Sequence, residues 1–278
     1  MDARPVTVVV DSTADIPPDL AASLGIVTVP LSVRFGEESF RDRVDIDSAE
    51  FLRRLKSAPE LPKTSQPPVT AFEEAFRAAA GGAVCVTVSS KLSGTFNAAR
   101  LAAGEVGEDR VRVIDSLGAS MIAGWPAVEA ARAAQAGADL AGVAAAAESA
   151  LARSHGYFVL DTLDYVYKGG RIGKAAQMVG SVFSIKPILS FEDGEVRPLE
   201  RVRTWSKALL RVAELARSHA PLAALAVLHF ASPGDAAALA DRLRDIAPGG
   251  EVLVAEIGPV LATYGGPGTI AVAAMSAA

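Results

Sequence analysis

Cysteine and histidine are scarce in this chain, and their scarcity argues against two kinds of site. The single cysteine, Cys85, cannot form a disulfide within the chain, and its place in an apolar run predicts a small buried side chain rather than a catalytic thiol. The three histidines, His155, His219 and His229, stand singly in the sequence, far from one another and from any pair of carboxylates. Their spacing therefore predicts no metal site.

Excess positive charge and long apolar runs are also missing. The 278 residues carry a net charge of −5, which gives no basic surface of the kind that nucleic-acid binding requires. The alanine-rich stretch 141–152 contains Glu148 and is too short to cross a bilayer. No basic segment or cleavage signal precedes the first apolar run. We therefore expect a soluble, cytoplasmic protein with no integral membrane segment and no nucleic-acid partner.

The signatures of common nucleotide-binding and hydrolytic sites are absent as well. Residues 169–174 look like a phosphate loop, but Lys168 stands where its first glycine belongs and Ala175 where its hydroxyl residue belongs. No Gly-x-Gly-x-x-Gly follows a strand, and Ser93 is not within a Gly-x-Ser-x-Gly motif. The chain therefore predicts no self-contained catalytic centre, although a hydrolase that pairs Ser93 with a distant histidine stays open.

The sequence does contain ample apolar residues in a regular alternation. Hydrophobic residues make up 50% of the chain and charged residues 21%, which is enough apolar material for a large core. In the first half, strand-like runs alternate with helical patterns, which is typical of a parallel sheet with helices on both faces. The expected strands are 6–10, 26–29, 84–88 and 111–114. The expected helices are 17–24, 48–55 with Ser48 as its cap, 69–80 and 95–104, followed by two alanine-rich helices before His155.

Near residue 156 the pattern changes toward a mixed sheet. Glu192-Asp193-Gly194 separates two strand-like runs and predicts a β-hairpin. The other expected elements are helices over 206–218 and 234–246, strands over 158–160, 222–230, 251–257 and 269–275, and a glycine-rich loop over 258–268. We predict an α/β protein of two domains: residues 1–156 with a mostly parallel sheet and helices on both faces, and residues 157–278 as a smaller domain with a mixed sheet, with a ligand between them.

Two short polar stretches predict an anion site. The loop Ser89-Ser90-Lys91-Leu92-Ser93-Gly94-Thr95 joins a buried strand to a helix that begins near Thr95. Free backbone N–H groups and the positive end of the helix dipole would face a guest there, and Ser89, Ser90, Ser93 and Thr95 would add hydroxyls. We predict that Ser93, Gly94 and Thr95 bind the guest. The turn Thr64-Ser65-Gln66-Pro67 adds a further hydroxyl. The alternative is that these residues only cap the helix and form turns.

Short polar residues follow three of the expected parallel strands. They are Asp11-Ser12, Ser89-Ser90 and Asp115-Ser116. Ligands of open α/β sheets bind at the carboxyl ends of the strands, so these pairs predict one shared rim. Asp and Ser also cap helices, and each residue could serve both purposes.

An apolar ligand with an anionic head fits this set of residues. A buried carboxylate needs several donors, and the hydroxyls of Thr64 and Ser93, the helix N-terminus and Arg171 would supply them. An acyl tail of about 15 methylenes would contribute roughly 12 kcal/mol before ordering costs are subtracted. The tail would therefore dominate affinity, and the head group would set orientation.

Several motifs follow one another along nearly the whole chain. They are Val10-Asp11-Ser12-Thr13-Ala14-Asp15, Pro30-Leu31-Ser32-Val33, Thr64-Ser65-Gln66-Pro67, Ser89-Ser90-Lys91-Leu92-Ser93-Gly94-Thr95, Ile114-Asp115-Ser116, Asp161-Thr162-Leu163, Lys168-Gly169-Gly170-Arg171-Ile172 and Ile185-Lys186-Pro187-Ile188-Leu189. Each motif is weakly specific, but in this order they resemble the DegV family, the fatty-acid-binding proteins that serve bacterial fatty acid kinase.

The resemblance implies a long-chain fatty acid in a tunnel between two α/β domains. It implies that Thr64 and Ser93 hold the carboxylate, and that Arg171 lies near both the carboxylate and the face presented to the kinase. It implies no cofactor and no catalysis by this chain, since a separate kinase subunit phosphorylates the bound acid to an acyl phosphate that enters phospholipid synthesis. The alternative is an esterase or acyl-transfer enzyme that uses Ser93.

Tyr264 departs from the family pattern, and Arg201 and Arg203 allow two interpretations. A histidine commonly follows the Ile257-Gly258-Pro259-Val260 segment, where this chain has Tyr264. A tyrosine hydroxyl can donate a hydrogen bond to the head group but brings no positive charge. Arg201 and Arg203 stand where the family tends to be basic. They would either contact the kinase or be charged side chains on a solvent-exposed strand edge.

Overall fold

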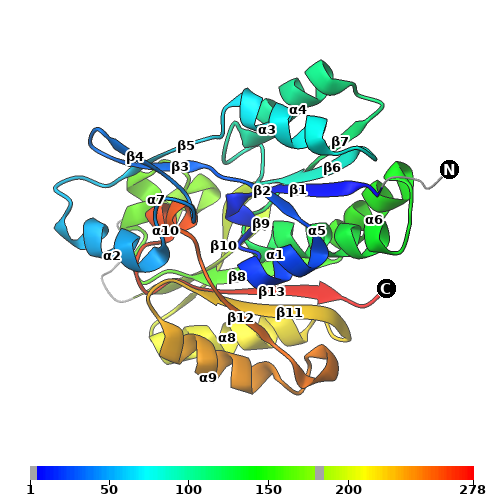
Figure 1. The fold of residues 1–278 in the computed structure, drawn as a ribbon. Helices are drawn as coiled ribbons and strands as arrows, with labels where there is room; N and C mark the ends of the chain where they lie inside the picture. The colour runs from blue at the N-terminus through cyan, green and yellow to red at the C-terminus, as the bar shows by residue number, and fades with distance from the viewer. Residues whose placement is uncertain (1–4, 179–184) are drawn as a thin grey trace.

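The computed structural model describes residues 5–178 and 185–278, and the first of its sheets is fully parallel. In spatial order its strands are β2 (Val27–Val29), β1 (Thr7–Asp11), β6 (Ala83–Thr87) and β7 (Val111–Asp115). All five residues of β6 are buried, because helices cover the sheet on both faces. These helices are α3 (Val69–Ala78) and α4 (Thr95–Val106) on one face and α1 (Pro18–Leu24), α5 (Met121–Gln135) and α6 (Leu140–Ala152) on the other (Figure 1).

The second sheet is mixed and has six strands. In spatial order they are β10 (Glu195–Val202), β9 (Lys186–Glu192), β8 (Ser154–Val159), β13 (Ile270–Ser276), β11 (Leu222–His229) and β12 (Leu253–Glu256). Only β11 and β12 pair in parallel. Helices α8 (Trp205–Arg217) and α9 (Pro233–Leu243) cover its outer face (Figure 1). Both sheets agree with the predicted α/β class.

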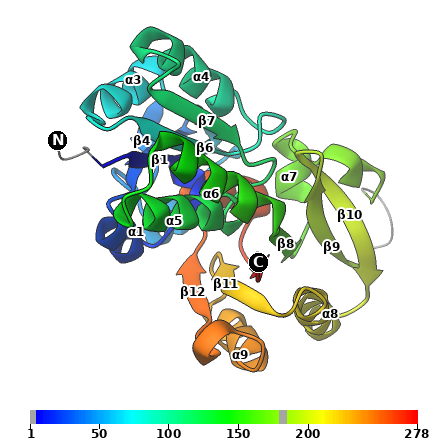
Figure 2. The same cartoon turned by 90° about the vertical axis from the view of Figure 1, so that its right-hand side faces the viewer.

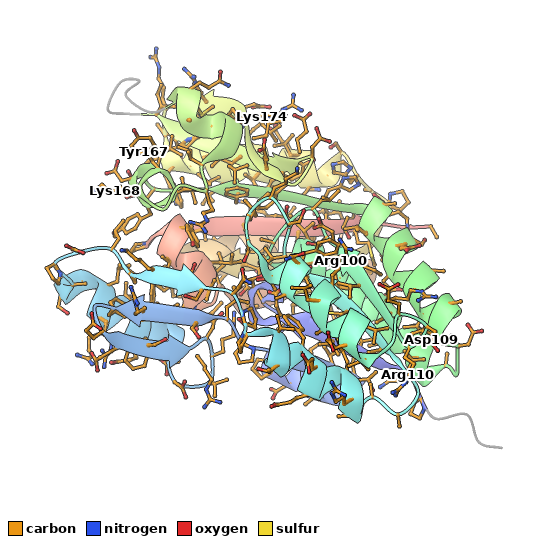
Figure 3. The ribbon with its side chains drawn as sticks, turned by 90° about the horizontal axis from the view of Figure 1, so that it is seen from above. Arg100, Asp109, Arg110, Tyr167, Lys168 and Lys174 are labelled. Atoms are coloured by element: carbon orange, nitrogen blue, oxygen red, sulfur yellow. The ribbon has the colours of Figure 1, made fainter. Side chains whose placement is uncertain are left out.

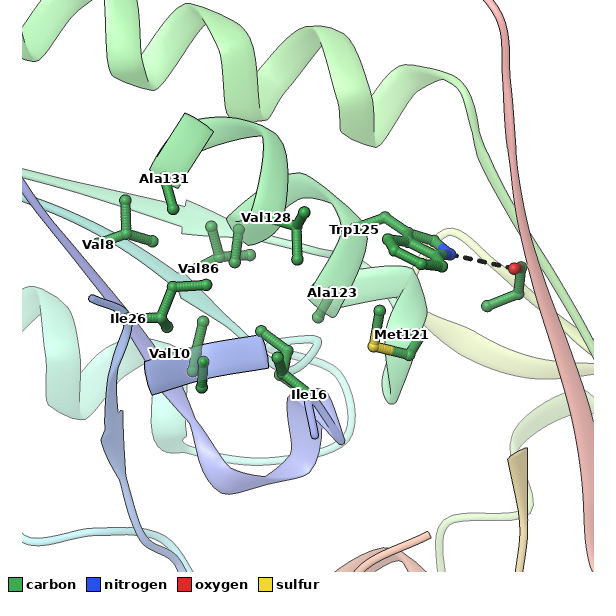
Figure 4. Close-up of a cluster of buried hydrophobic side chains, with 14 of the residues drawn as sticks. Val8, Val10, Ile16, Ile26, Val86, Met121, Ala123, Trp125, Val128 and Ala131 are labelled. Carbon is green, nitrogen blue, oxygen red and sulfur yellow. Dashed lines mark hydrogen bonds between the residues drawn. The ribbon is translucent and has the colours of Figure 1, made fainter. Parts of the chain in front are cut away.

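Helix α5 lies between the two sheets and contacts β1 and β6 on one side and β8 and β13 on the other. Figure 4 shows its residues Ala123, Val128 and Ala131 facing the valines of the parallel sheet. On the opposite side the indole N–H of Trp125 donates to the carbonyl of Ala273 in β13 at 3.1 Å. One helix therefore joins both sheets through a single apolar core.

A small antiparallel sheet, which the sequence does not predict, joins the two halves. Its strands are β4 (Glu38–Arg41), β3 (Ser32–Phe35) and β5 (Lys63–Ser65). Helix α2 (Ser48–Ser57) follows β4 in the chain, and α10 (Pro259–Gly265) packs against β3, β5 and α2. Helix α7 (Asp164–Lys168) lies beside the β9–β10 hairpin of the mixed sheet (Figure 2). Short 3₁₀ helices complete the fold: η1 (Ser12–Ala14), η2 (Gly173–Met178) and η3 (Pro248–Gly250).

Most predicted elements are confirmed, including the hairpin, whose Asp193 and Gly194 both adopt positive φ as a two-residue turn requires. Three details are wrong. Thr64 lies in strand β5 and not in a turn, because β3 supplies a pairing partner. The glycine-rich loop 258–268 contains α10, which Pro259 starts and Gly266 ends. The cap of α2 is Asp47, whose carboxylate accepts from the N–H of Glu50, whereas the Ser48 hydroxyl donates to the carbonyl of Ile257.

The mixed sheet has more strands than the parallel one, although it was expected in the smaller part of the chain. Its first strand, β8, begins at Ser154, and the division of the chain at residue 156 stays a prediction. Within residues 5–178 and 185–278 no helix is both long and apolar enough to cross a membrane.

Asp42, where β4 leads toward α2, is a buried carboxyl group with an unusual pKa. Burial raises its pKa to about 7, although the Ser12 hydroxyl donates to it at 2.7 Å. Between pH 4 and 7 the unfolded chain loses this proton while the folded chain keeps it, so stability falls as pH rises through this range. Asparagine carries no charge at any pH. We therefore expect the melting temperature of Asp42→Asn to rise relative to that of the parent chain as pH increases, and the difference to reach several degrees by pH 8.

Thermal unfolding of both proteins at steps between pH 4 and 8 measures this effect. A difference in melting temperature that stays constant with pH would mean that Asp42 ionises normally in the fold. The exposed substitution Asp19→Asn in α1 is the matched control, and its difference from the parent should show no such growth.

Candidate functional site

A cavity of about 370 Å³ lies between the two sheets. Most of its wall is apolar and comes from both halves of the chain, including Leu31 and Val88 from the first half and Leu160, Phe191 and Val272 from the second. Polar side chains are also present in the wall: Thr13, Thr64, Ser65, Gln66, Ser93, Ser120, Tyr157, Arg171, Tyr264 and Thr269. Five of the six predicted ligand-binding residues line the cavity: Thr64, Ser93, Gly94, Arg171 and Tyr264.

Thr64 and Tyr264 meet at this cavity from opposite ends of the sequence. Their hydroxyl groups share a hydrogen bond, with Thr64 on β5 and Tyr264 on α10. The contact depends on two features that the sequence did not reveal, namely the small sheet that holds β5 and the helix that replaces the expected loop. A ligand carboxylate between these two hydroxyls could accept from both.

Arg171 lies against Tyr264 at the same wall. Its guanidinium carbon is 5.3 Å from the centroid of the Tyr264 ring, which is the distance of a cation–π contact. Its Nη1 donates to the carbonyl of Gly169 at 2.9 Å, and its Nε donates to the carbonyl of Leu92 at 3.3 Å. Gly169 must be a glycine here, because a Cβ at that position would lie 2.6 Å from Cδ1 of Tyr264. The side chain is exposed, with N–H groups left to bind an oxyanion.

The loop before α4 contains Ser93, Gly94 and Thr95, and the three residues have different surroundings. The Ser93 hydroxyl lines the cavity and shares a hydrogen bond of 2.8 Å with Oγ1 of Thr95. Thr95 itself is fully buried and is not in the cavity wall, so it contacts Ser93 and not the space for a ligand. Gly94 lets Gln66 approach, since a Cβ there would lie 1.9 Å from Oε1 of Gln66.

The polar residues that follow the parallel strands hold this loop in place. Asp11 accepts from the N–H of Val88 at 2.7 Å, and Asp115 accepts from the N–H of Ser90 at 3.1 Å. The carbonyl of Ser89 accepts from the N–H of Ser93 at 3.1 Å. The hydroxyl of Ser89 donates to the carbonyl of Gly194 at 2.7 Å. The strand-end residues therefore lie together at one edge of the parallel sheet, and the carboxylates of Asp11 and Asp115 accept hydrogen bonds from the backbone.

Ser89 links this loop to the tip of the β9–β10 hairpin, so we expect Ser89→Ala to act at a distance on Ser93. Loss of the Ser89 hydroxyl leaves the Gly194 carbonyl without its donor and should lower the free energy of unfolding by about 1–2 kcal/mol. If the cavity binds a fatty acid, as the sequence resemblance implies, the affinity for the acid should fall severalfold, whereas the affinity for a fatty acid methyl ester should change little, because Ser93 would contact only the charged head group. Isothermal titration with both ligands measures this difference.

Ser90→Ala is the matched control, because Ser90 is exposed in the same loop and outside the cavity wall. Equal losses for acid and ester in Ser89→Ala would show that Ser89 supports the fold without positioning Ser93.

The three histidines, Arg201 and Arg203 lie outside this cavity. None of His155, His219 and His229 is part of its wall, so Ser93 has no histidine base there. His155 and His219 instead stack on each other with ring centroids 3.5 Å apart. In the part of the chain that the structure describes, no group of three or more His, Cys, Asp or Glu side chains could hold a metal ion.

Arg201 and Arg203 are exposed at the end of β10 and just beyond it, and neither is in the cavity wall. Cys85 is fully buried in the parallel sheet, as predicted, and burial raises the pKa of its thiol.

Comparison with known sequences decides the family. Residues 5–277 match the DegV family, which is described as a family of uncharacterised proteins. A DegV domain-containing protein of Streptomyces coelicolor is 40% identical over 281 residues, which cover 99% of each chain. The chain belongs to the DegV family. The order of motifs in the sequence had predicted this membership.

Solved DegV structures share this fold over almost the whole chain. A DegV family protein of Thermus thermophilus, described by its fatty acid binding, superposes with a TM-score of 0.90 at 32% identity and covers 98% of this chain and 100% of its own. DegV of Bacillus subtilis, described as a fatty acid binding protein, superposes with a TM-score of 0.87 at 30% identity, covering 98% and 100%. Fatty acid binding is thus a property of relatives with this DegV fold.

Proposed function

We propose that this DegV protein binds a long-chain fatty acid in the cavity between its sheets and presents the carboxylate to a separate kinase. The observation that carries the proposal is the meeting of Thr64, Ser93, Arg171 and Tyr264 at one apolar cavity. Three hydroxyls and a guanidinium supply donors for a carboxylate. The carboxylate would replace the hydrogen bond that Thr64 and Tyr264 now share.

The apolar wall suits an acyl tail. A volume of about 370 Å³ is within the range of ligand pockets, and the lining is mostly aliphatic and aromatic. Each buried methylene contributes about 0.8 kcal/mol, so the tail supplies most of the binding free energy. The hydroxyls and Arg171 fix which end of the ligand faces outward.

Presentation to a kinase is supported by the exposed residues around Arg171. Tyr167 and Lys168 precede Arg171 in the chain and Lys174 follows it. All three side chains are exposed (Figure 3), and Tyr167 is 53% exposed. An exposed aromatic ring among cationic side chains suits a protein partner with an acidic surface. Arg201 and Arg203, both exposed, would extend this docking surface.

The kinase would supply the chemistry. A carboxylate oxygen of the bound acid attacks the γ-phosphorus of ATP, the bond to the β–γ bridging oxygen breaks, and ADP leaves with an acyl phosphate as product. This chain would act as a carrier and not as the catalyst. Because the step uses ATP, we propose a cytoplasmic location.

Mass spectrometry of the purified protein under native conditions tests the proposal directly. We expect a complex with one fatty acid, which is released intact on denaturation. A protein that carries no lipid and takes up neither palmitate nor oleate on titration would refute the proposal. Steady hydrolysis of acyl esters by the isolated chain, abolished in Ser93→Ala, would establish the alternative esterase.

A further inference from the structure

Two hydroxyl groups in the cavity wall come from elements that carry none of the head-group residues. Thr13 lies in η1 after β1, and Ser120 immediately precedes α5. The two residues are neighbours, because the N–H of Ser120 donates to the carbonyl of Thr13 at 2.8 Å. They form a polar pair in a wall that is otherwise mostly apolar, with Ala119 and Ile122 on either side of Ser120 in the chain.

Both hydroxyls use their hydrogen on a buried carboxylate. Oγ1 of Thr13 donates to Asp11 at 2.5 Å, and Oγ of Ser120 donates to Asp15 at 2.7 Å. Each of these carboxyl residues is only 1% exposed. Asp15 is fixed further by Nη2 of Arg43 at 2.7 Å and the N–H of Gly258 at 2.9 Å. The hydroxyl hydrogens therefore point away from any ligand in the cavity.

The lone pairs of Thr13 and Ser120 are left as acceptors for a ligand. A hydroxyl has one hydrogen and two lone pairs, so each of these oxygens can still accept a hydrogen bond. A plain alkyl chain cannot donate a hydrogen bond to them, whereas a hydroxyl group on the chain can. Ser120 also has φ 58° and ψ −147°, a conformation that glycine adopts far more easily. The fold therefore holds a serine hydroxyl in place where a glycine would be less strained.

We infer that this cavity favours a fatty acid whose acyl chain carries a hydroxyl group, which donates a hydrogen bond to Thr13 or Ser120. The inference rests on the proposed fatty acid binding and specifies its ligand class. A chain hydroxyl at one particular distance from the carboxylate would reach the pair. At other positions it would be buried against apolar side chains and would weaken binding.

Titration of the lipid-free protein with stearic acid and a series of monohydroxystearic acids tests the inference. We expect one position, or two adjacent positions, of the hydroxyl to bind roughly two- to tenfold more tightly than stearic acid. If stearic acid and all hydroxy acids fail to bind, the proposed fatty acid binding itself is wrong. If stearic acid binds and no hydroxy acid binds more tightly, only the inference is wrong.

Two variants separate this recognition from structural damage. Thr13→Val keeps the shape of the side chain, and Ser120→Gly relieves the backbone strain, while each removes an acceptor. Each variant also leaves a buried carboxylate, Asp11 or Asp15, one donor short, so the readout is the ratio of the two affinities. Both variants should lose the preference for the hydroxy acid over stearic acid, whereas structural damage alone would weaken the binding of both ligands and keep their ratio. Thr28→Val, at an exposed position of β2, is the control and should keep the preference. A preference that survives in both cavity variants would overturn the inference.

Discussion

A chain with both Thr64→Val and Ser93→Ala should lose its affinity for fatty acid by roughly a hundredfold to ten-thousandfold. Each hydroxyl is expected to donate one hydrogen bond to the carboxylate, and a bond to a charged group is worth about 1.5–3 kcal/mol. The effect should be large because the carboxylate of the proposed ligand would enter a mostly apolar cavity, where water cannot replace the missing donors. Tyr264 would also lose the partner that its hydroxyl has on Thr64.

Titration calorimetry with palmitate measures this loss, and native mass spectrometry should show the double variant without bound lipid. The melting temperature of the lipid-free protein should change little, since both side chains are only partly buried at the cavity. Ser90→Ala is again the control and should bind as the parent does. A double variant that retains its lipid would show that the carboxylate lies elsewhere.

Arg171→Ala should reduce phosphorylation of the bound fatty acid by about a hundredfold or more, while leaving the fold and much of the lipid affinity intact. Preorganised cations at a developing oxyanion contribute effects of about this size. The tail supplies most of the affinity, so the loss of one exposed guanidinium should affect binding less than turnover. Arg171→Lys should recover only part of the rate, because an ammonium group lacks the planar fork that pairs with two oxygens.

Acyl phosphate formation with a fatty acid kinase subunit and ATP, at limiting concentrations of this carrier, measures the effect. Arg77→Ala, on the exposed side of α3, is the control for loss of a positive charge. If Arg171→Ala changes only the concentration of this protein that gives the half-maximal rate, Arg171 acts in docking the kinase. If it lowers the maximal rate, Arg171 acts on the reacting head group. Unchanged kinetics would exclude Arg171 from both.

The sequence predicted the sheets well wherever local patterns were strong. The run Ala83–Thr87 is apolar up to Val86 and ends in the β-branched Thr87, so its burial in a parallel sheet follows from its hydrophobicity. Asp193-Gly194 specifies its hairpin because few other residues adopt the two positive φ angles of that turn. Strand β5 was missed because it has only three residues and its sequence shows no strand pattern. It is a strand because it pairs with β3.

The sequence by itself determined which residues could form a head-group site, since the motif around Ser93 and the Gly-Gly-Arg turn are local. It also determined that α4 begins at Thr95 and that Cys85 is a core residue. Only the tertiary structure decided that Thr64 and Tyr264 meet, because that contact joins positions 200 residues apart through the pairing of β5 and the packing of α10. It also turned Thr95 toward Ser93 and the strand-end carboxylates toward backbone, because buried polar groups must find partners within the fold.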